Sequence, residues 1–562
     1  MPKFTLDNRE IEFKEGETII QAAKNAGTIL PNFCWHPALS VSGNCRICLV
    51  EIEGAPKLSI ACATPAAEGM VVRSASEKAI HAQNAVMEFL LINHPLDCPI
   101  CDEAGECKLQ DYAYKYGVGF SRYDEEKNQK EKRVDLGPNV LFDQERCISC
   151  SRCIRFCDEV AHSPQLTFVK RGENVTIETF PGEELDNPYS MNVIEICPVG
   201  ALTSKDFRFE ARVWEMSFTD SVCPGCSRGC NSTIGVRNNN ILRIEPRENL
   251  EVNDYWLCDW GRLNTFKWVN DPELRIDEPR IKLSEAESSN GDDRQIEVSW
   301  DEAISKAVNE LKNYPADEIL FIASPFSTLE DNYALKKLAN EAVGTDNIVY
   351  VPYIDESFED DILRKADMTP NSNGLKLLGI KAVDGTTIAN LESGKYKLIY
   401  VLNDDARRLP GSENYLSHIN TSIQHIQTRN KFSGHAHILF PDSTYAEING
   451  TFVNFQNRVQ RIRPAVTTLD QERLIGEYSV SRWDKFGAPN DRWTHGKKFN
   501  ARPAWKVIKN IAKVMGHDFG FEDSEEVFIQ LSNSIAGMEG YDYDALGSTG
   551  LVVGQRPMVE TN

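Results

Sequence analysis

The sequence of 562 residues is short of positive charge and of long apolar runs. It has 61 Lys and Arg residues against 84 Asp and Glu residues, a net charge of −23. Phosphate backbones and anionic lipids are bound by clustered cations, and no Lys/Arg-rich patch occurs, so we expect no nucleic acid partner. Mostly apolar stretches such as 85–92 fall short of the ~20 residues that span a bilayer, so we expect no direct membrane insertion. The start lacks the apolar core of a secretory signal, which favours a cytoplasmic protein that reaches a membrane only through partner subunits.

Several cofactor and catalytic motifs are also missing. The sequence has no G-x-G-x-x-G and no G-x-x-x-x-G-K-[ST], so no nicotinamide, flavin or nucleoside triphosphate site can be assigned to a phosphate loop. No Ser–His–Asp arrangement and no suitably spaced pair of acids points to a catalytic residue. No period of 20 to 50 residues indicates a solenoid. We therefore expect no autonomous catalytic site.

What the sequence does have is 16 cysteines, all of them between Cys34 and Cys258. Disulfide frameworks are typical of small secreted domains, whereas thiols in a long intracellular chain more often bind metals. We therefore predict metal-ligating thiolates in a reduced compartment. Because no cysteine follows Cys258, the rest of the chain offers no thiolate to a molybdenum or tungsten ion.

The spacing of apolar residues predicts two kinds of fold. A hairpin at 3–13, a helix within 16–27 and strands at 48–52 and 70–73 fit a small α+β ferredoxin-like unit, and an amphipathic helix follows at 76–92, with its apolar side chains at Ile80, Val86, Phe89 and Leu90. The mixed-charge segment 122–135 is typical of a solvated linker.

After residue 262, strands alternate with helices, which predicts parallel α/β layers. The expected strands are 319–323, 348–351, 398–402 and 438–440, and a helix is expected at 329–343. Residues 283–297 and the tail after Gly537 are predicted to be surface loops.

The first group of ligands is Cys34-x10-Cys45-x2-Cys48-x13-Cys62. Two cysteines separated by two residues can hold one iron from a tight loop, and the outer two complete the four thiolates that an iron-sulfur cluster requires. A structural zinc site with four cysteines is the alternative, although zinc sites usually present two close pairs.

The second group is His94-x3-Cys98-x2-Cys101-x5-Cys107. Three cysteines leave one iron of a cluster without a thiolate, and His94 is the nearest residue that can donate a neutral nitrogen. An imidazole in place of a thiolate removes a negative charge and should raise the reduction potential. We therefore predict His94 as the fourth ligand.

The third group starts at Cys147-x2-Cys150-x2-Cys153-x3-Cys157 and is followed by a remote Cys197-Pro198. In two-cluster bacterial ferredoxins the first three cysteines of such a run pair with a remote Cys-Pro. We predict one cluster on Cys147, Cys150, Cys153 and Cys197, with Cys157 as a free thiol. A cluster on Cys157 in place of Cys197 remains the competing choice.

The fourth group is Cys223-x2-Cys226-x3-Cys230-x27-Cys258, in a loop tightened by Pro224 and Gly225. Four thiolates suit a [4Fe-4S] cluster, and zinc is again the alternative. The four groups use fifteen of the 16 cysteines and one histidine. So many sites in one chain favour an electron-transfer role, because each cluster exchanges single electrons.

In this order the ligand spacings closely resemble the large iron-sulfur subunit (G-type) of respiratory complex I, NADH:quinone oxidoreductase, over roughly residues 1–270. The segment 195–203 (EICPVGALT) matches the end of that family's all-cysteine cluster motif. The resemblance implies one [2Fe-2S] cluster, in the first group, and three [4Fe-4S] clusters. The fourth group matches a cluster that some bacterial members add aside from the main electron route.

The rest of the chain resembles molybdopterin oxidoreductases more weakly, at 257–262, 299–303 and 438–460. The region is short for that fold, and Trp260 stands where formate dehydrogenase-like enzymes usually carry a lysine. The resemblance therefore implies a shortened α/β region that has lost its cofactor, so that molybdopterin is not expected.

The predicted fold is multidomain α+β and α/β, with an N-terminal ferredoxin-like β-grasp unit, [4Fe-4S] ferredoxin-like units and a shortened molybdopterin-oxidoreductase-like α/β region. The expected domains are a [2Fe-2S] domain at 1–78, a one-histidine, three-cysteine [4Fe-4S] segment at 79–120, an all-cysteine [4Fe-4S] domain at 121–215, a molybdopterin-oxidoreductase-type [4Fe-4S] domain at 216–272 and the α/β domain at 273–562.

By resemblance, the chain is an electron-transfer subunit of a proton-translocating NADH:quinone oxidoreductase. Electrons would come from a flavin-bearing, NADH-oxidising partner and continue toward quinone through further iron-sulfur and membrane subunits, on the cytoplasmic side of the bacterial inner membrane. Three alternatives stay open: a molybdopterin-dependent formate dehydrogenase-like enzyme, the relay subunit of a soluble NAD-linked hydrogenase, and a zinc-stapled interaction protein.

Overall fold

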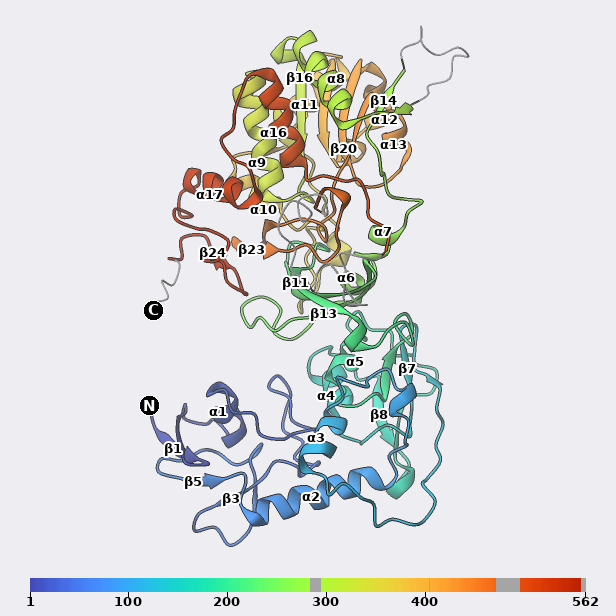
Figure 1. Ribbon diagram of the computed structural model, residues 1–562, viewed down its shortest axis with the longest axis vertical. Helices are drawn as coiled ribbons and strands as arrows, with labels where there is room; N and C mark the ends of the chain where they lie inside the picture. Colours follow the sequence, from blue (N-terminus) through green and yellow to red (C-terminus); the bar gives the residue numbers. More distant parts are fainter. Residues whose placement is uncertain (284–294, 404, 472–495, 557–562) are drawn as a thin grey trace, which may run out of the picture. The chain divides into compact units, whose positions relative to one another are not determined.

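The computed structural model describes residues 1–283, 295–403, 405–471 and 496–556. The chain folds into two compact units, Met1–Glu215 and Met216–Asn562 (Figure 1). No helix in the described ranges is both long and apolar enough to cross a bilayer.

The first unit begins with a five-stranded sheet in the order β2-β1-β5-β3-β4. Asp7 and Asn8 both have positive φ, which is the backbone of a tight hairpin turn, as the sequence predicts. The helix α1 starts with a capping box between Thr18 and Gln21 and buries its apolar side chains on the sheet. The elements are β1 (Lys3–Leu6), β2 (Arg9–Glu12), α1 (Ile19–Asn25), β3 (Leu49–Ile52), β4 (Ser59–Ile60) and β5 (Val71–Arg73).

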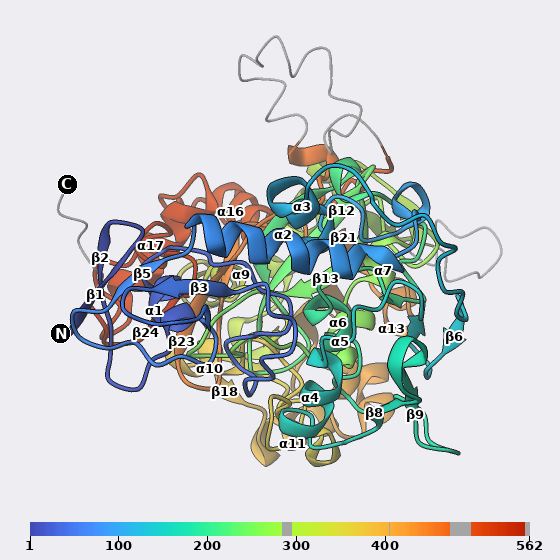
Figure 2. The same ribbon diagram turned by 90° about the horizontal axis from the view of Figure 1, so that it is seen from below.

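The helix α2 (Glu77–Ile92) forms where it is expected, but its predicted apolar face is wrong. Ile80 is 44% exposed and Phe89 is 73% exposed, while Ala79, Gln83 and Met87 are buried. The helix packs against β3 and α3 (Lys108–Tyr116) (Figure 2). Because these neighbours cover the face that carries Ala79, Gln83 and Met87, the side chains of Ile80 and Phe89 remain outside.

The rest of the first unit is built from short elements around the cysteine loops. Residues 122–133 form no helix or strand, as expected of a linker. A three-stranded sheet has the order β10-β7-β6, and β8 pairs with β9. The elements are η1 (Cys98–Ile100), β6 (Val134–Asp135), β7 (Val140–Phe142), α4 (Arg152–Glu159), β8 (Leu166–Val169), η2 (Gly172–Asn174), β9 (Thr176–Thr179), α5 (Asn192–Ile196), β10 (Leu202–Ser204) and η3 (Val213–Glu215).

The second unit opens with an antiparallel three-stranded sheet and two short helices that surround the fourth cysteine group. The elements are β11 (Ser217–Val222), β12 (Asn231–Arg237), β13 (Asn240–Pro246), α6 (Asp259–Leu263) and α7 (Lys267–Asn270). After α7, the fully buried Arg275 makes an ion pair with Glu447 at 2.9 Å, which fixes the later 442–447 loop beside this region.

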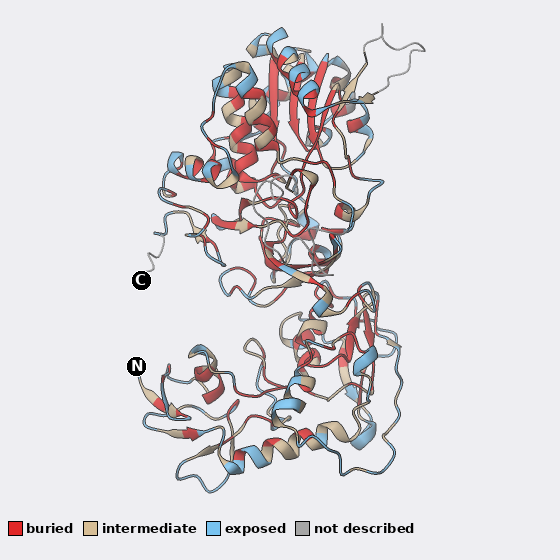
Figure 3. Ribbon diagram, in the orientation of Figure 1, coloured by how far each residue is buried: buried red, intermediate tan, exposed pale blue. Residues whose placement is uncertain are grey.

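An eight-stranded sheet in the order β15-β14-β21-β20-β19-β16-β17-β18 forms the centre of the second unit. The strands from β21 to β18 are parallel, and β14 and β15 are antiparallel to their neighbours. The central strands β16, β19, β20 and β21 are wholly buried (Figure 3), because helices cover both faces of a parallel sheet. The strands are β14 (Arg280–Lys282), β15 (Gln295–Glu297), β16 (Ile319–Ala323), β17 (Ile348–Tyr350), β18 (Lys381–Ala382), β19 (Leu398–Leu402), β20 (Thr421–Ile426) and β21 (Ile438–Pro441).

The strand order reverses once. After β16 the chain adds β17 and then β18 on one side, and it returns to place β19 on the other side of β16. Such a reversal opens a crevice at the carboxyl ends of the two strands, which is where open α/β sheets bind ligands.

The helices of the second unit include the one predicted at 329–343, which the structure divides into α9 (Leu329–Lys337) and the π-helical turn η5 (Leu338–Val343). The other helical segments are α8 (Trp300–Asn313), η4 (Ala316–Glu318), η6 (Glu356–Phe358), α10 (Ser372–Leu377), α11 (Gly385–Glu392), η7 (Asp405–Arg408), α12 (Ser412–Tyr415), η8 (Leu416–His418), α13 (Lys431–Gly434), α16 (Ala504–Met515) and α17 (Ser524–Ser534).

Two predicted surface loops are partly wrong. Within 283–297 the strand β15 pairs with β14, and residues 284–294 lie outside the described residues. In the tail, Met538, Tyr541 and Leu546 are buried, and β24 (Leu551–Val552) completes a sheet with β22 (Gly450–Val453) and β23 (Arg458–Ile462). The tail packs inward because its aromatic and aliphatic side chains fill the sheet's apolar core.

Candidate iron-sulfur sites

The structure brings the four cysteines of the first group together. The loop that carries them turns sharply, since Gly43 and Arg46 both have positive φ. The thiols of Cys34 and Cys45 are hydrogen-bond partners, and so are those of Cys48 and Cys62. The hydrogen bond between the first two lowers the pKa of Cys34 to about 5. The same hydrogen bond raises the pKa of Cys45, and burial raises it further.

The four predicted ligands of the third group line one small cavity. Cys147, Cys150, Cys153 and Cys197 face it, together with Phe142 and Ile148. Ser149 and Ser151 have positive φ, so the backbone of this loop is held in an uncommon conformation. Burial raises the pKa of Cys147 to about 11 and those of Cys153 and Cys197 well above the ordinary thiol value, and the neighbouring thiols add to the shift. Four such thiolates need a metal charge beside them.

Cys157 is buried in the helix α4, and it is not among the residues that line this cavity. Burial alone raises the pKa of its thiol to about 12. The geometry therefore favours the predicted set with Cys197 over the competing set with Cys157.

The fourth group is also assembled. Cys223, Cys226, Cys230 and Cys258 are all buried, and the charges of the other three thiols each raise the pKa of Cys230. A Cβ atom added at Gly261 would lie 2.8 Å from Cys223 Sγ, so the backbone of α6 approaches the thiols as closely as it can. Desolvation is the main cause that raises the pKa of Cys223 and Cys230, and it raises that of Cys258 to about 12.

The cysteines of the second group are buried to different extents. Cys101 and Cys107 are buried, whereas Cys98 is exposed. Burial lowers the pKa of His94 to about 4, and Lys127 and Arg146 lower it further, so its imidazole is neutral at pH 7, as a metal ligand must be. His94 also lines a pocket with Cys147 of the third group.

The loop 197–200 lies against the second and third groups at once. Cys197 belongs to the third group, Cys107 Sγ is 3.9 Å from the Pro198 carbonyl oxygen, and a Cβ atom at Gly200 would lie 2.3 Å from Cys101 Sγ. Only glycine allows Cys101 this close approach.

Two arginines of α4 join the first group to the third. Arg152, which is 3% exposed, donates to the Asn32 side-chain oxygen at 3.0 Å, the Ile196 carbonyl at 3.1 Å and the Trp35 carbonyl. Arg155 donates to the Cys34 carbonyl at 2.5 Å. Sequence reasoning missed both residues, because a charged residue within a cysteine loop gives no sign that it is buried.

In the described part of the chain, no three side chains of His, Cys, Asp or Glu converge enough to hold a single metal ion. A cluster has a different requirement, because its thiolates bind several irons rather than one. The assembled thiols of the first, third and fourth groups fit that requirement.

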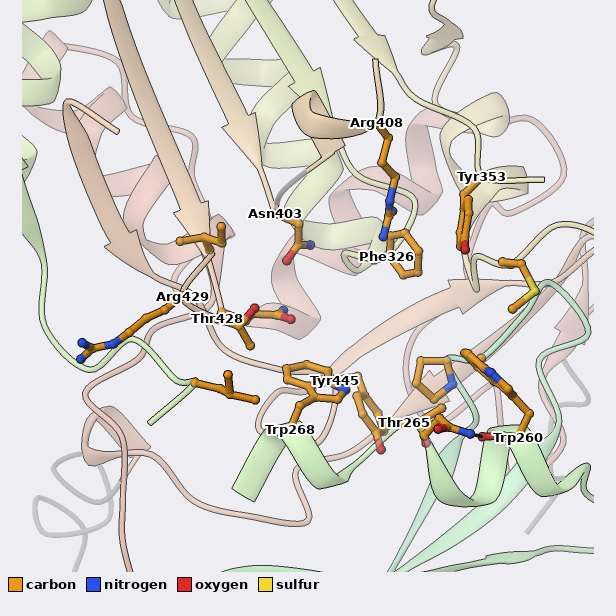
Figure 4. Close-up of a pocket in the computed structure, with 17 residues that line it drawn as sticks. Trp260, Thr265, Trp268, Phe326, Tyr353, Asn403, Arg408, Thr428, Arg429 and Tyr445 are labelled. Atoms are coloured by element: carbon orange, nitrogen blue, oxygen red, sulfur yellow. Dashed lines mark hydrogen bonds between the residues drawn. The ribbon is translucent and has the colours of Figure 1, made fainter. Parts of the chain in front are cut away.

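A cavity of about 410 Å³ lies beside the fourth group. One wall carries Phe326, Asn403 and Arg408 at the ends of the sheet strands, and the facing wall carries Trp268 and Tyr445 (Figure 4). Pro224 and Gly225 of the cysteine loop also line it, and no cysteine side chain does. The sequence offered no motif for this cavity.

Five family models match the chain. They are the 2Fe-2S iron-sulfur cluster binding domain at 2–77, the NADH-ubiquinone oxidoreductase-G iron-sulfur binding region at 83–122, the ferredoxin-like domain of NADH-quinone oxidoreductase subunit 3 at 137–203, the molybdopterin oxidoreductase Fe4S4 domain at 216–267 and the molybdopterin oxidoreductase family at 275–376 and 372–473.

Curated relatives are named as subunits of NADH-quinone oxidoreductase. The G subunit of the NADH-quinone oxidoreductase of Rickettsia conorii is 40% identical over 347 residues, which are 62% of this chain and 50% of that protein. The corresponding protein of Rickettsia bellii is 38% identical over 403 residues, 72% of this chain and 55% of that protein. The chain is similar to the G subunits of NADH-quinone oxidoreductase.

A mitochondrial protein is similar as well. The NADH dehydrogenase [ubiquinone] iron-sulfur protein 1 of Solanum tuberosum is 39% identical over 343 residues, 61% of this chain and 45% of that protein. The chain thus spans about half the length of the curated relatives it matches.

A solved NAD+-reducing [NiFe]-hydrogenase in the H2-reduced state is 33% identical. The match covers 38% of this chain and 91% of that one, with a TM-score of 0.34. The predicted fold class is confirmed by the matched 2Fe-2S, 4Fe-4S and molybdopterin oxidoreductase regions and by the mixed α/β structure.

Proposed function

We propose that this chain is an electron-transfer subunit of an NADH:quinone oxidoreductase. Its four ligand groups would hold one [2Fe-2S] and three [4Fe-4S] clusters, each of which accepts and releases single electrons. The chain's own residues keep the thiols in place, bury them from water and bring the ligand loops of different groups into contact. No residue of the chain is assigned a separate catalytic step.

The observation that carries this proposal is the contact between ligand groups in the first unit. Arg152 ties the Trp35 carbonyl beside Cys34 to the helix that bears Cys153, and the 197–200 loop touches Cys101 and Cys107. A protein that uses metals only to stabilise its fold does not require its separate metal sites to lie close together. A relay does, because electron transfer requires closely spaced centres.

The individual cluster ligands, the partners and the location of the chain are also part of this proposal. The ligands would be Cys34, Cys45, Cys48 and Cys62 in the first group, His94, Cys98, Cys101 and Cys107 in the second, and the Cys147 and Cys223 groups as described. Partners would be a flavin- and NADH-binding subunit together with further iron-sulfur and membrane subunits. The chain would lie on the cytoplasmic side of the bacterial inner membrane, held there by its partners.

Metal analysis of the anaerobically purified chain tests the proposal. Two irons in the first group and four in each of the others give about 14 irons per chain, without stoichiometric zinc, molybdenum or tungsten. One molybdenum or tungsten per chain would instead support a molybdopterin-dependent enzyme, and several zinc ions without iron would support a structural role.

A further inference from the structure

Arg152 is a buried cation that lies between two of the ligand groups. Its side chain is 3% exposed and lines the cavity of the third group. It also donates to the carbonyl oxygen of Trp35, the residue that directly follows Cys34 of the first group. The thiols whose charges act on the guanidinium belong to both groups, and they are Cys150, Cys197, Cys34 and Cys45. One positive charge therefore lies close to the ligands of two sites.

In the part of the chain that the structure describes, the acceptors of Arg152 are all neutral. They are two backbone carbonyls and the side-chain oxygen of Asn32. Arg146, which is equally buried, differs because it makes ion pairs with Asp97 and Asp143, each at 3.1 Å. Buried charges are normally compensated by a counter-charge. The negative charge that compensates Arg152 must therefore come from the thiolates and from the clusters that they hold.

One donor of Arg152 has no acceptor among the described residues. The Nη1 and Nη2 atoms donate to the Ile196 carbonyl and to the Asn32 side chain, whereas the Nε atom is buried and makes no hydrogen bond. Buried N–H groups are rarely left without an acceptor. Because the side chain lines the cavity of the third group, the acceptor that suits this N–H group is a sulfur atom of the cluster bound there.

We infer that Arg152 raises the reduction potentials of the first and third clusters together, an inference that rests on the proposed electron-transfer function. A cluster gains one negative charge when it is reduced, and a nearby guanidinium stabilises that charge. A hydrogen bond to a cluster sulfur acts in the same direction. Because Arg152 raises both potentials, the driving force for electron transfer between these two clusters changes less than either potential does.

Redox titration of the full-length, cluster-loaded chain, followed by electron paramagnetic resonance, tests the inference. Arg152→Gln should decrease the equilibrium constant for reduction of each cluster about tenfold, a fall of about 59 mV in each one-electron potential. The two signals are told apart by the temperatures at which they broaden. If either cluster is present with an unchanged potential, the inference is wrong. A wild-type chain without iron would instead overturn the proposed function, and this inference with it.

Two further variants separate the charge of Arg152 from its structural role. Arg152→Lys keeps the charge but loses most of the hydrogen bonds, so both equilibrium constants should stay within about threefold of the wild-type values. Asn32→Asp keeps the arginine and places a carboxylate beside it, so both potentials should fall as they do in Arg152→Gln. Equal falls in Arg152→Lys and Arg152→Gln, or unchanged potentials in Asn32→Asp, would overturn the inference.

Two other arginines of the first unit provide matched controls. Arg155 is half-buried and donates to the Cys34 carbonyl, so Arg155→Gln should decrease the equilibrium constants for reduction only about two- to threefold, because solvent screens its charge. Arg9 is exposed on β2, and Arg9→Gln should leave both potentials unchanged. A fall in Arg9→Gln as large as that in Arg152→Gln would show an effect of net charge alone and would overturn the inference.

Discussion

The cysteine loops of the first unit and the sheet of the second unit are held together in different ways. The loop from Cys147 to Cys153 has two residues with positive φ and, together with Cys197, lines a small cavity with four thiols, three of which are buried. The sheet from β21 to β18 is packed by an apolar cluster on each of its two faces. The comparison teaches that the stability of the loops depends on the metal that the thiols bind, because metal binding contributes directly to folding. The stability of the sheet depends on apolar burial alone.

Removal of iron should produce the largest difference in stability between the cysteine loops and the sheet. After anaerobic chelation, we expect backbone amides of 142–157 and 192–202 to exchange with solvent by several orders of magnitude faster, because the free energy of metal binding is lost. Amides of β16 and β19 should keep their protection. Hydrogen exchange measured by mass spectrometry checks this, and equal deprotection of the sheet would contradict it.

A matched pair of cysteine variants tests the cavity of the third group. Cys197→Ala should lose one [4Fe-4S] cluster, about four irons per chain, because Cys197 lines the cavity. Cys157→Ala, an equally buried thiol outside the lining, should keep the full iron content. Iron analysis and electron paramagnetic resonance distinguish them. Loss of the cluster in Cys157→Ala alone would reverse the assignment.

Replacement of Arg152 tests the contact between groups. Arg152→Met should lower the free energy of unfolding of the first unit by about 3 kcal/mol, because buried carbonyl oxygens lose their donor. Arg155→Met, at a half-buried position, should cost about 1 kcal/mol. Denaturant unfolding followed by the cluster absorbance measures both. Equal losses of unfolding free energy in the two variants would show that the burial of Arg152 does not explain its contribution to stability.

The buried Glu330 makes the stability of the second unit depend on pH. Desolvation raises its pKa to about 8, although Thr451 and Tyr543 donate to it. Between its unfolded value and about 8 the native state holds the proton and the unfolded state releases it, so stability falls as pH rises. We expect a loss of about 2 kcal/mol from pH 5.5 to 7, which Glu330→Gln should remove. The exposed Glu302 provides the control: Glu302→Gln should leave the slope of thermal stability against pH unchanged.

The last prediction concerns His94, the predicted nitrogen ligand of the second group. His94→Cys should retain a cluster and lower its midpoint potential on the order of 100 mV, because a thiolate adds a negative charge. Redox titration followed by electron paramagnetic resonance measures the shift. An unchanged potential would exclude His94 as a ligand.

Local patterns predicted the elements well. The strands at 319–323 and 398–402 form with those bounds, because continuous apolar runs between turn signals suit a sheet covered on both faces. The predicted face of α2 was wrong, because the choice between its two apolar sides depends on β3 and α3. The buried tail around Tyr541 was missed for the same reason, since its partners lie in β23 and β24.

The sequence by itself determined the number and kind of the candidate cluster sites. Iron-sulfur clusters require four ligands each, and close pairs such as Cys45 and Cys48 are visible without a structure. The tertiary structure decided that Cys197 and not Cys157 faces the cavity, that Arg152 joins two groups, and that Arg408 and Trp268 face one cavity. These relations join residues far apart in the chain, and only packing brings them together.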